Sequence, residues 1–288
     1  MTIRIVTDST CDLPANVVEE LGITVIPLYI NIGDKGYLEG IEITRTEFYT
    51  NLPGYEHHPT TGTPGLNAFL TAFDRLADEG ATEILTIHIS ESLSAVVQVA
   101  QTAARQFKRI PVTVRDGGQL SLGTGFQVEK AARMAAEGKS LEEILAALDD
   151  LGPRTFVAAA LDTLEFLRRS GRMNRFLHGI GSLLHLKPIL TMNQGKPESL
   201  RVRTTAKAEA KLIEILKTHT PIEKFALVHT NAAEKAEAFM HKISDLLPDL
   251  PVYSMDITPV IGAHIGPGAV GFAIITKKSP QFEVQYGR

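Results

Sequence analysis

The sequence predicts an α/β protein with two α/β domains, the first with a mainly parallel sheet covered by helices and the second with a mixed sheet. Short runs of β-branched and apolar residues alternate with stretches of helical periodicity, which is typical of parallel strands covered on both faces. The alternation restarts after Gly152 and Pro153, so we expect an N-terminal domain at residues 1–152 and a C-terminal domain at 153–288. A chain of 288 residues is long enough for two ordinary domains.

Strands and helices alternate through the first half. The predicted strands are Ile3–Thr7, Ile23–Ile32, Glu83–Ile89 and Val112–Arg115, with a helix at Ala15–Leu21 and further helices after the last two strands. Another helix is predicted where apolar residues recur at helical spacing, at Leu66, Phe69, Leu70, Phe73 and Leu76. Thr63 is placed to cap this helix and Pro64 to open it. Ser140 and Glu143 form a capping box for a helix that runs to Leu151.

The same alternation continues in the second half. The predicted strands are Phe156–Leu161, Pro188–Met192, Phe225–Thr230, Val252–Asp256 and Val270–Thr276. The predicted helices lie near Thr163–Arg169 and at Thr205–Thr218 and Ala233–Leu247. Asn231 opens the last of these, with Glu234 three residues later.

Composition narrows the class of protein. The net charge of −4 argues against a general nucleic-acid binder, which needs a basic surface to displace counterions. A single cysteine, Cys11, excludes an internal disulfide and fits a reducing compartment. The start of the chain lacks a secretion signal, and no apolar run approaches the roughly 20 residues of a membrane helix. We therefore expect a cytoplasmic protein without stable membrane insertion.

Hydroxyl-rich loops mark the predicted binding site. In open parallel sheets, ligands bind beyond the carboxyl ends of strands. The loops predicted there are Asp8–Thr10, Thr60–Thr63, Ser90–Ser94 and Asp116–Gly118. Hydroxyls and free N–H groups at helix starts suit an anion, and the scarcity of lysine and arginine favours a carboxylate over a phosphate. The alternative, that these serines and threonines only cap helices, stays open.

Other ligand classes find little support. The segment Gly123–Val128 has only the first part of a dinucleotide fingerprint and does not directly follow a strand. Neither a phosphate-binding GK[ST] loop nor an H-E-x-x-H motif occurs, and the nine histidines show no metal-ligand spacing. A hydrolase triad of Ser94, His264 and Asp8 is conceivable, but no G-x-S-x-G motif surrounds a serine. We expect no metal and no cofactor.

The second half adds a glycine-rich segment and a basic one. Gly262–Gly271 holds four glycines and His264 ahead of a predicted strand, so backbone and imidazole could approach a ligand there, although a structural turn explains it equally well. Between Arg168 and Lys211 the chain carries a charge of +8, against −12 for the rest. This reversal suggests docking of an acidic or phosphorylated partner.

Six motifs, in the same order along nearly the whole chain, resemble those of the DegV family of fatty-acid-binding proteins. They are Asp8–Leu13 (D-S-T-x-D-L), Thr60–Pro64 (T-S-x-P), Ser90–Ala95 (S-S-x-L-S-G), Leu164–Met173 (L-x-x-L…G-G-R-I), Leu186–Leu190 (I-K-P-I-L) and the glycine- and histidine-rich Gly262–Gly271. Each motif is weak alone, and their shared register carries the resemblance.

The resemblance implies a function as well as a fold. It implies two α/β domains with a lipid tunnel, which binds a fatty acid such as palmitate or oleate and presents its carboxylate to a separate ATP-dependent fatty-acid kinase subunit. Thr61, Gly62, Ser94 and His264 match the positions expected at the carboxylate. From the basic segment, Arg172, Arg175 and Arg203 are candidates for controlling access or contacting the kinase.

The chain departs from the family pattern at four positions. Gly62 replaces a serine, Glu91 a second serine, Ala95 a glycine and Ser170 another glycine. Gly62 lacks a hydroxyl that could bind the carboxylate, and Glu91 adds negative charge near it unless its side chain faces solvent. Two other functions stay open: a lipid-sensing regulatory protein, and a stand-alone hydrolase or kinase.

Overall fold

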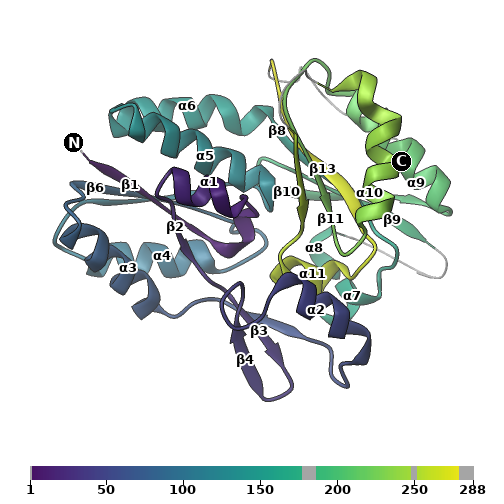
Figure 1. The fold of residues 1–288 in the computed structure, drawn as a ribbon, viewed down its shortest axis with the longest axis horizontal. Helices are drawn as coiled ribbons and strands as arrows, with labels where there is room; N and C mark the ends of the chain where they lie inside the picture. The colour runs from purple at the N-terminus through teal and green to yellow at the C-terminus, as the bar shows by residue number, and fades with distance from the viewer. Residues whose placement is uncertain (1, 177–185, 248–251, 279–288) are drawn as a thin grey trace.

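Two β-sheets stand side by side, with helices between them and on their outer faces (Figure 1). The structure, a computed structural model, describes residues 2–176, 186–247 and 252–278. Within this part of the chain, no helix is long and apolar enough to cross a bilayer.

The first sheet is parallel throughout, as predicted. Its strands, in the order β2-β1-β6-β7, are β2 (Thr24–Ile26), β1 (Ile3–Asp8), β6 (Glu83–His88) and β7 (Val112–Asp116). Successive side chains of a strand point to opposite faces of the sheet. Val6 and Ile84 therefore pack under α3 (Leu66–Asp78) and α4 (Val96–Gln106), whereas Ile5 and Leu85 pack under α5 (Leu122–Ala136) and α6 (Leu141–Arg154). Both faces are therefore buried, which explains the nearly continuous apolar runs in the sequence.

The second sheet is mixed, which confirms the predicted fold class. Its six strands, in the order β10-β9-β8-β13-β11-β12, are β10 (Lys196–Val202), β9 (Lys187–Asn193), β8 (Thr155–Ala160), β13 (Val270–Thr276), β11 (Ile222–His229) and β12 (Tyr253–Asp256). Only β11 and β12 pair in parallel. The sequence prediction did not include β10.

A third, antiparallel sheet was not predicted. It consists of β4 (Lys35–Leu38), β3 (Tyr29–Ile32) and β5 (Thr60–Gly62). The single strand expected at Ile23–Ile32 is wrong, because Pro27 has no N–H to continue the ladder and the chain leaves the first sheet there. Thr60–Gly62, expected in a loop, is the edge strand β5.

Eleven α-helices, α1 to α11, belong to the part of the chain that the structure describes. They are α1 (Ala15–Glu20), α2 (Arg45–Asn51), α3 (Leu66–Asp78), α4 (Val96–Gln106), α5 (Leu122–Ala136), α6 (Leu141–Arg154), α7 (Glu165–Arg169), α8 (Met173–Phe176), α9 (Thr205–Thr218), α10 (Ala233–Ile243) and α11 (Pro259–Ile265). Short 3-10 turns, η1 to η3, lie at Ser9–Cys11, Leu52–Gly54 and Ser244–Leu246. Helices α3 and α4 cover the first sheet, and α9 and α10 cover the outer face of the second (Figure 1).

Helix α5 lies between the two sheets and contacts both. All residues from Leu122 to Glu129 are buried, and polar residues such as Lys130 and Arg133 are exposed only in its second half. A Cβ on Gly123 would lie 2.6 Å from Val157 of β8, and one on Gly125 would lie 2.4 Å from the carbonyl oxygen of the buried Cys11. The glycines of the incomplete dinucleotide fingerprint therefore serve close helix packing.

Three predictions about helix ends need correction: the caps at Thr63 and Asn231, and the end at Leu247. Helix α3 begins at Leu66 with Gly65 at its N-cap, so Thr63 does not cap it. Helix α10 begins at Ala233 as predicted, but Asn231 does not cap it, because Asn231 adopts a left-handed conformation and its N–H donates to Asp256. The same helix ends at Ile243, where a 3-10 turn follows instead of the helix expected to Leu247. The capping box of Ser140 and Glu143 is present as predicted.

The chain passes from the first half to the second without a linker. Helix α6 runs to Arg154, and β8 begins at Thr155. One apolar cluster includes residues of β1, α5, α6, β8 and β13, so it is continuous between the two sheets. The division into residues 1–152 and 153–288 stays a prediction.

Candidate functional site

A cavity of about 410 Å³ lies at the carboxyl ends of β1 and β6, where ligands of parallel sheets bind. The first half contributes η1, β5 and the loop that follows β6 to its wall. The second half closes it with Leu167 of α7, Arg172 and four residues of α11. The ligand of such a cavity would therefore contact both halves of the chain.

Polar side chains from both halves line this cavity. Thr61, Ser94 and His264, predicted from distant parts of the sequence, all contribute to its wall. The Oγ1 of Thr61 and the Nε2 of His264 are 3.0 Å apart, within hydrogen-bonding distance. The Ser94 hydroxyl makes no hydrogen bond with any other residue that the structure describes, so it can bind a ligand.

The backbone explains why these side chains meet. Thr61 is the central residue of β5, so its side chain and that of Thr60 face opposite sides of the strand. His264 belongs to α11, a helix of seven residues where a glycine-rich turn was the alternative. Gly62 also lines the cavity, but a Cβ there would point toward Tyr29 and Asn31.

The three predicted arginines lie in different places. Arg172 is half-buried, lines the cavity, and donates from Nη1 to the Ser170 carbonyl at 3.0 Å. Arg203 is exposed in the bend between β10 and α9 and does not line the cavity. Arg175 belongs to α8, and its side chain is outside what the structure describes. Their role in access or partner contact stays a prediction.

Most of the remaining wall of the cavity is apolar. A smaller cavity of about 40 Å³ shares three wall residues with it: Leu120, Ile261 and Ile265. The walls of the smaller cavity come mainly from apolar residues of β8 and β9, such as Val157 and Leu190. Hydroxyls and an imidazole at one end and hydrocarbon at the other match an amphiphile with a compact polar head and a long apolar tail.

Asp8 supports the wall of the cavity from behind. Its carboxylate is fully buried and bonds to the His88 Nδ1 at 2.9 Å, the Ile89 N–H at 3.2 Å and the Thr10 N–H at 3.0 Å. Burial alone would raise the pKa of Asp8, but the bonds from His88 and Thr10 outweigh it and lower the pKa. Thr10 and Ile89 both line the cavity, so Asp8 fixes two parts of its wall.

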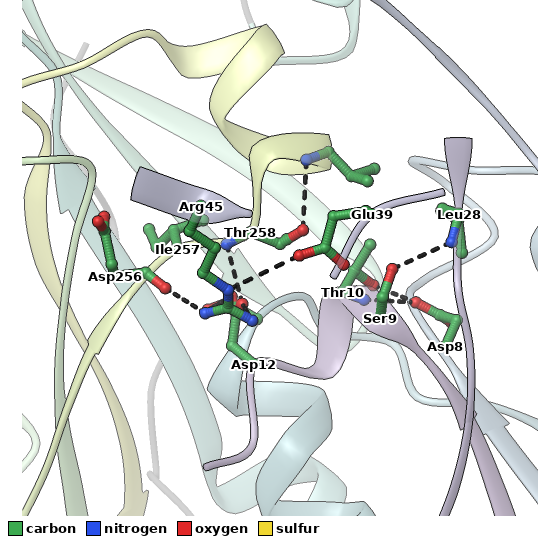
Figure 2. Close-up of polar contacts among 12 residues, drawn as sticks. Asp8, Ser9, Thr10, Asp12, Leu28, Glu39, Arg45, Asp256, Ile257 and Thr258 are labelled. Atoms are coloured by element: carbon green, nitrogen blue, oxygen red, sulfur yellow. Dashed lines mark hydrogen bonds and ion pairs between the residues drawn. The ribbon is translucent and has the colours of Figure 1, made fainter. Parts of the chain in front are cut away.

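A second buried cluster joins the two halves (Figure 2). Asp12 pairs with Arg45 at 3.0 Å, and its carboxylate also accepts the Ser121 hydroxyl at 2.5 Å. Glu39 lies 3.7 Å from the same guanidinium. Burial raises the pKa of both Asp12 and Glu39, and the charge of Arg45 offsets only part of this.

Sequence reasoning missed several of these residues. Arg45 carries no local motif, and its partners become visible only when the chain folds. The apolar walls, such as Leu120 and Leu167, have the same pattern as ordinary core residues. Glu91, a departure from the family pattern, is exposed and outside the cavity, so its charge faces solvent.

Among the residues that the structure describes, no group of three or more His, Cys, Asp or Glu side chains is arranged to bind a metal ion. His58, which directly follows His57 in the chain, packs against the Phe166 ring with centroids 5.5 Å apart.

Comparison with known proteins gives one consistent result. A family model described as an uncharacterised protein of the DegV family matches residues 2–277. A DegV domain-containing protein of Streptomyces coelicolor is 35% identical over 281 residues, which are 96% of this chain and 99% of the relative.

Solved structures of the same kind superpose closely. A DegV family protein from Thermus thermophilus, described by its fatty acid binding, matches with a TM-score of 0.86 and 36% identity over 96% of this chain and all of its own. DegV of Bacillus subtilis, described as a fatty acid binding protein, matches with a TM-score of 0.88 and 29% identity over 96% of this chain and all of its own.

Proposed function

Because this chain belongs to the DegV family, we propose that it binds a long-chain fatty acid in the cavity between its two halves. The observation that carries the proposal is the cavity itself, whose wall contains the Thr61–His264 pair and the Ser94 hydroxyl and shares apolar residues with a smaller pocket. The similar structures from T. thermophilus and B. subtilis, both described as binding fatty acid, support it.

The carboxylate would bind where Thr61, Ser94 and His264 converge, with the backbone of Gly62 beside them. Each hydrogen bond contributes about 1 kcal/mol, whereas each buried methylene contributes about 0.8 kcal/mol. A long acyl chain therefore supplies most of the affinity, and the polar groups fix which end of the ligand enters. Arg172 lines the same cavity and adds a positive charge that favours an anion.

We further propose that the chain performs no chemistry alone and presents the carboxylate to an ATP-dependent fatty-acid kinase. Four exposed basic residues make no ion pair with any other described residue and could meet an acidic surface: Lys196, Arg201, Arg203 and Lys207. They belong to β10 and the start of α9, and β10 contacts α8, which follows Arg172 in the chain. Docking there would bring the kinase near the cavity.

Mass spectrometry of the natively purified protein, before and after organic extraction, tests the binding proposal. We expect one fatty acid per chain, and we expect Ser94→Ala to lose it more easily. Ser92→Ala is the matched control, since Ser92 lies in the same loop but outside the cavity wall. Absence of lipid, together with no uptake of added fatty acid, would contradict the proposal.

Reconstitution with a bacterial fatty-acid kinase subunit tests the second proposal. We expect neutralisation of Lys196, Arg201 and Arg203, which lie outside the cavity wall, to abolish acyl-phosphate formation while fatty acid remains bound. The same change of charge at the exposed Arg105, Lys108 and Lys130, in the first half, is the control. Unchanged phosphorylation by the first variant would refute the docking surface, and a lipid-loaded protein that no kinase uses would favour a lipid-sensing regulator.

A further inference from the structure

Side chains of the first half hold the turn at residues 256–258, which starts α11. The bonds, in chain order, are Arg45 to the Asp256 carbonyl, Tyr49 to the Ile257 carbonyl at 3.0 Å, and the Thr258 N–H to Asp12 at 2.9 Å. Figure 2 shows Arg45 and Asp12 directed at this turn. Three successive backbone groups are therefore fixed by one cluster.

The same helix carries the imidazole of the candidate carboxylate site. Helix α11 rises about 1.5 Å per residue, so the bond at Thr258 lies about 9 Å from His264. A helix of two turns moves as one body, and a shift at its start displaces His264 relative to Thr61, which belongs to a different sheet. The Thr61–His264 distance of 3.0 Å thus depends on where the turn is held.

The contact between α2 and α11 leaves little room for adjustment. A Cβ on Gly262 would lie 2.1 Å from the Tyr49 hydroxyl oxygen. Asp12 is itself fixed by Arg45 and by the Ser121 hydroxyl, and it follows directly after η1, whose Thr10 lines the cavity. One short segment therefore touches both the cavity wall and the start of α11.

We propose that Asp12 and Arg45 are positioning residues for the carboxylate site: they hold the 256–258 turn so that His264 meets Thr61 at the polar end of the cavity. This proposal rests on the proposed function and deepens it, because it assigns selectivity for the carboxylate head to side chains that do not line the cavity. Affinity for the apolar tail does not depend on them.

A purely stabilising role explains the cluster less well. Moving a buried ion pair out of water costs about as much free energy as the pair returns, so such pairs are weak sources of stability. The chain offers a matched comparison in Glu129, which is 5% exposed and pairs with Lys224 of β11 at 2.5 Å. Glu129 also joins the two halves through a buried carboxylate, but it bonds to no residue of α11.

The test compares binding of a long-chain fatty acid with binding of the primary alcohol of the same length. We expect the wild type to prefer the acid. Asp12→Asn and Arg45→Lys should lower affinity for the acid at least about fivefold, the value of one hydrogen bond, and leave affinity for the alcohol unchanged. Glu129→Gln should leave the acid-to-alcohol ratio unchanged.

A double-mutant cycle identifies the route of the effect. If Asp12 acts through His264, Asp12→Asn should lower the affinity for the fatty acid when His264 is present. The same substitution should cause no further loss of affinity when it is added to His264→Gln. The imidazole NMR signals of His264 should also shift in Asp12→Asn and stay unchanged in Glu129→Gln. Tyr49→Phe, which removes one hydrogen bond to the turn and little volume, provides the same test if Asp12→Asn does not fold.

Two results would overturn the positioning role: equal loss of acid and alcohol affinity, or a full effect of Asp12→Asn in the His264→Gln background. A wild type that binds acid and alcohol equally would instead contradict the proposed carboxylate site. The two failures are therefore distinguishable in one set of measurements.

Discussion

Thr60 and Thr61 are neighbours on β5 whose side chains face opposite sides of the strand. Thr60 is exposed, whereas Thr61 lines the cavity and meets His264. We expect Thr61→Val to weaken fatty-acid binding by about 1 kcal/mol, roughly fivefold, because the shape is kept and one hydroxyl is lost. Calorimetric titration of delipidated protein measures this, and Thr60→Val serves as the control. Equal losses in both variants would contradict the assignment.

Gly62 replaces a serine of the family pattern, and the alternation along β5 predicts the consequence. A Cβ at this position would lie 3.4 Å from the Cβ of Tyr29, an ordinary contact, on the face opposite Thr61. We therefore expect Gly62→Ser to fold and to change fatty-acid affinity by less than about 0.5 kcal/mol, below the value of one hydrogen bond. An increase equal to a full hydrogen bond, absent in Gly62→Ala, would show that the serine side chain reaches the ligand.

The sequence predicted the polar residues of the site better than the apolar ones. Thr61, Ser94 and His264 stand out because hydroxyl-rich loops and a histidine among glycines are unusual next to strands. Leu120 and Ile265 were not predictable, since a leucine against a ligand and a leucine against the core follow the same periodicity. Arg172 was predicted for access, and only the fold places it in the cavity wall.

At the scale of elements, α11 depends on the absence of a side chain at Gly262. A Cβ there would overlap the Tyr49 hydroxyl, so we expect Gly262→Ala to destabilise the protein by about 1–3 kcal/mol, the usual effect of overpacking. Urea denaturation measures the change. Gly54→Ala is the control, because nothing lies within 4 Å of that position. Unchanged stability of Gly262→Ala would mean that α2 and α11 adapt freely.

Another prediction concerns the C-terminal end of α9. His219 is buried against the Phe156 ring, with centroids 4.2 Å apart, and burial lowers its pKa although its bond to the Ile215 carbonyl opposes this. The unfolded chain therefore gains the proton first as the pH falls below 6.5, which lowers the free energy of unfolding of the wild type.

We expect the urea midpoint of the wild type to fall more steeply from about pH 7 to about pH 5 than that of His219→Gln. Groups that titrate elsewhere contribute equally to both proteins, so the difference isolates this residue. His241→Gln, at an exposed position of α10, should follow the wild type. Parallel curves for the wild type and His219→Gln would refute the prediction.

Element boundaries were predictable where one local signal decides them. The capping box of Ser140 fixes the start of α6 with neighbouring atoms alone. The start of α3 was wrong because the segment after β5 stays extended, with Thr63 in the cavity wall. The third sheet was missed because β5 is only three residues long and pairs with a strand about 30 residues away, which no local pattern encodes.

At the scale of the whole molecule, the alternation of strands and helices was sufficient to predict two sheets of different kinds. It was not sufficient to predict that α5 would lie between them. The first half of α5 is buried all round, so its pattern in the sequence does not tell which sheet it covers. The apolar core is continuous between the two sheets, so the domain boundary between residues 152 and 153 stays a prediction.

The alkylation rate of the single cysteine reports how often the protein opens locally around it. Cys11 is 3% exposed, and burial raises the pKa of its thiol to about 12, so the reactive thiolate is scarce in the closed protein. Alkylation must therefore wait until η1 separates from α5. We expect bound fatty acid to slow alkylation. A ligand that binds only the folded state stabilises it, so open states that cannot hold the ligand become less populated. Time-resolved mass spectrometry measures the rate, and equal rates with and without ligand would mean that η1 opens while the ligand stays bound.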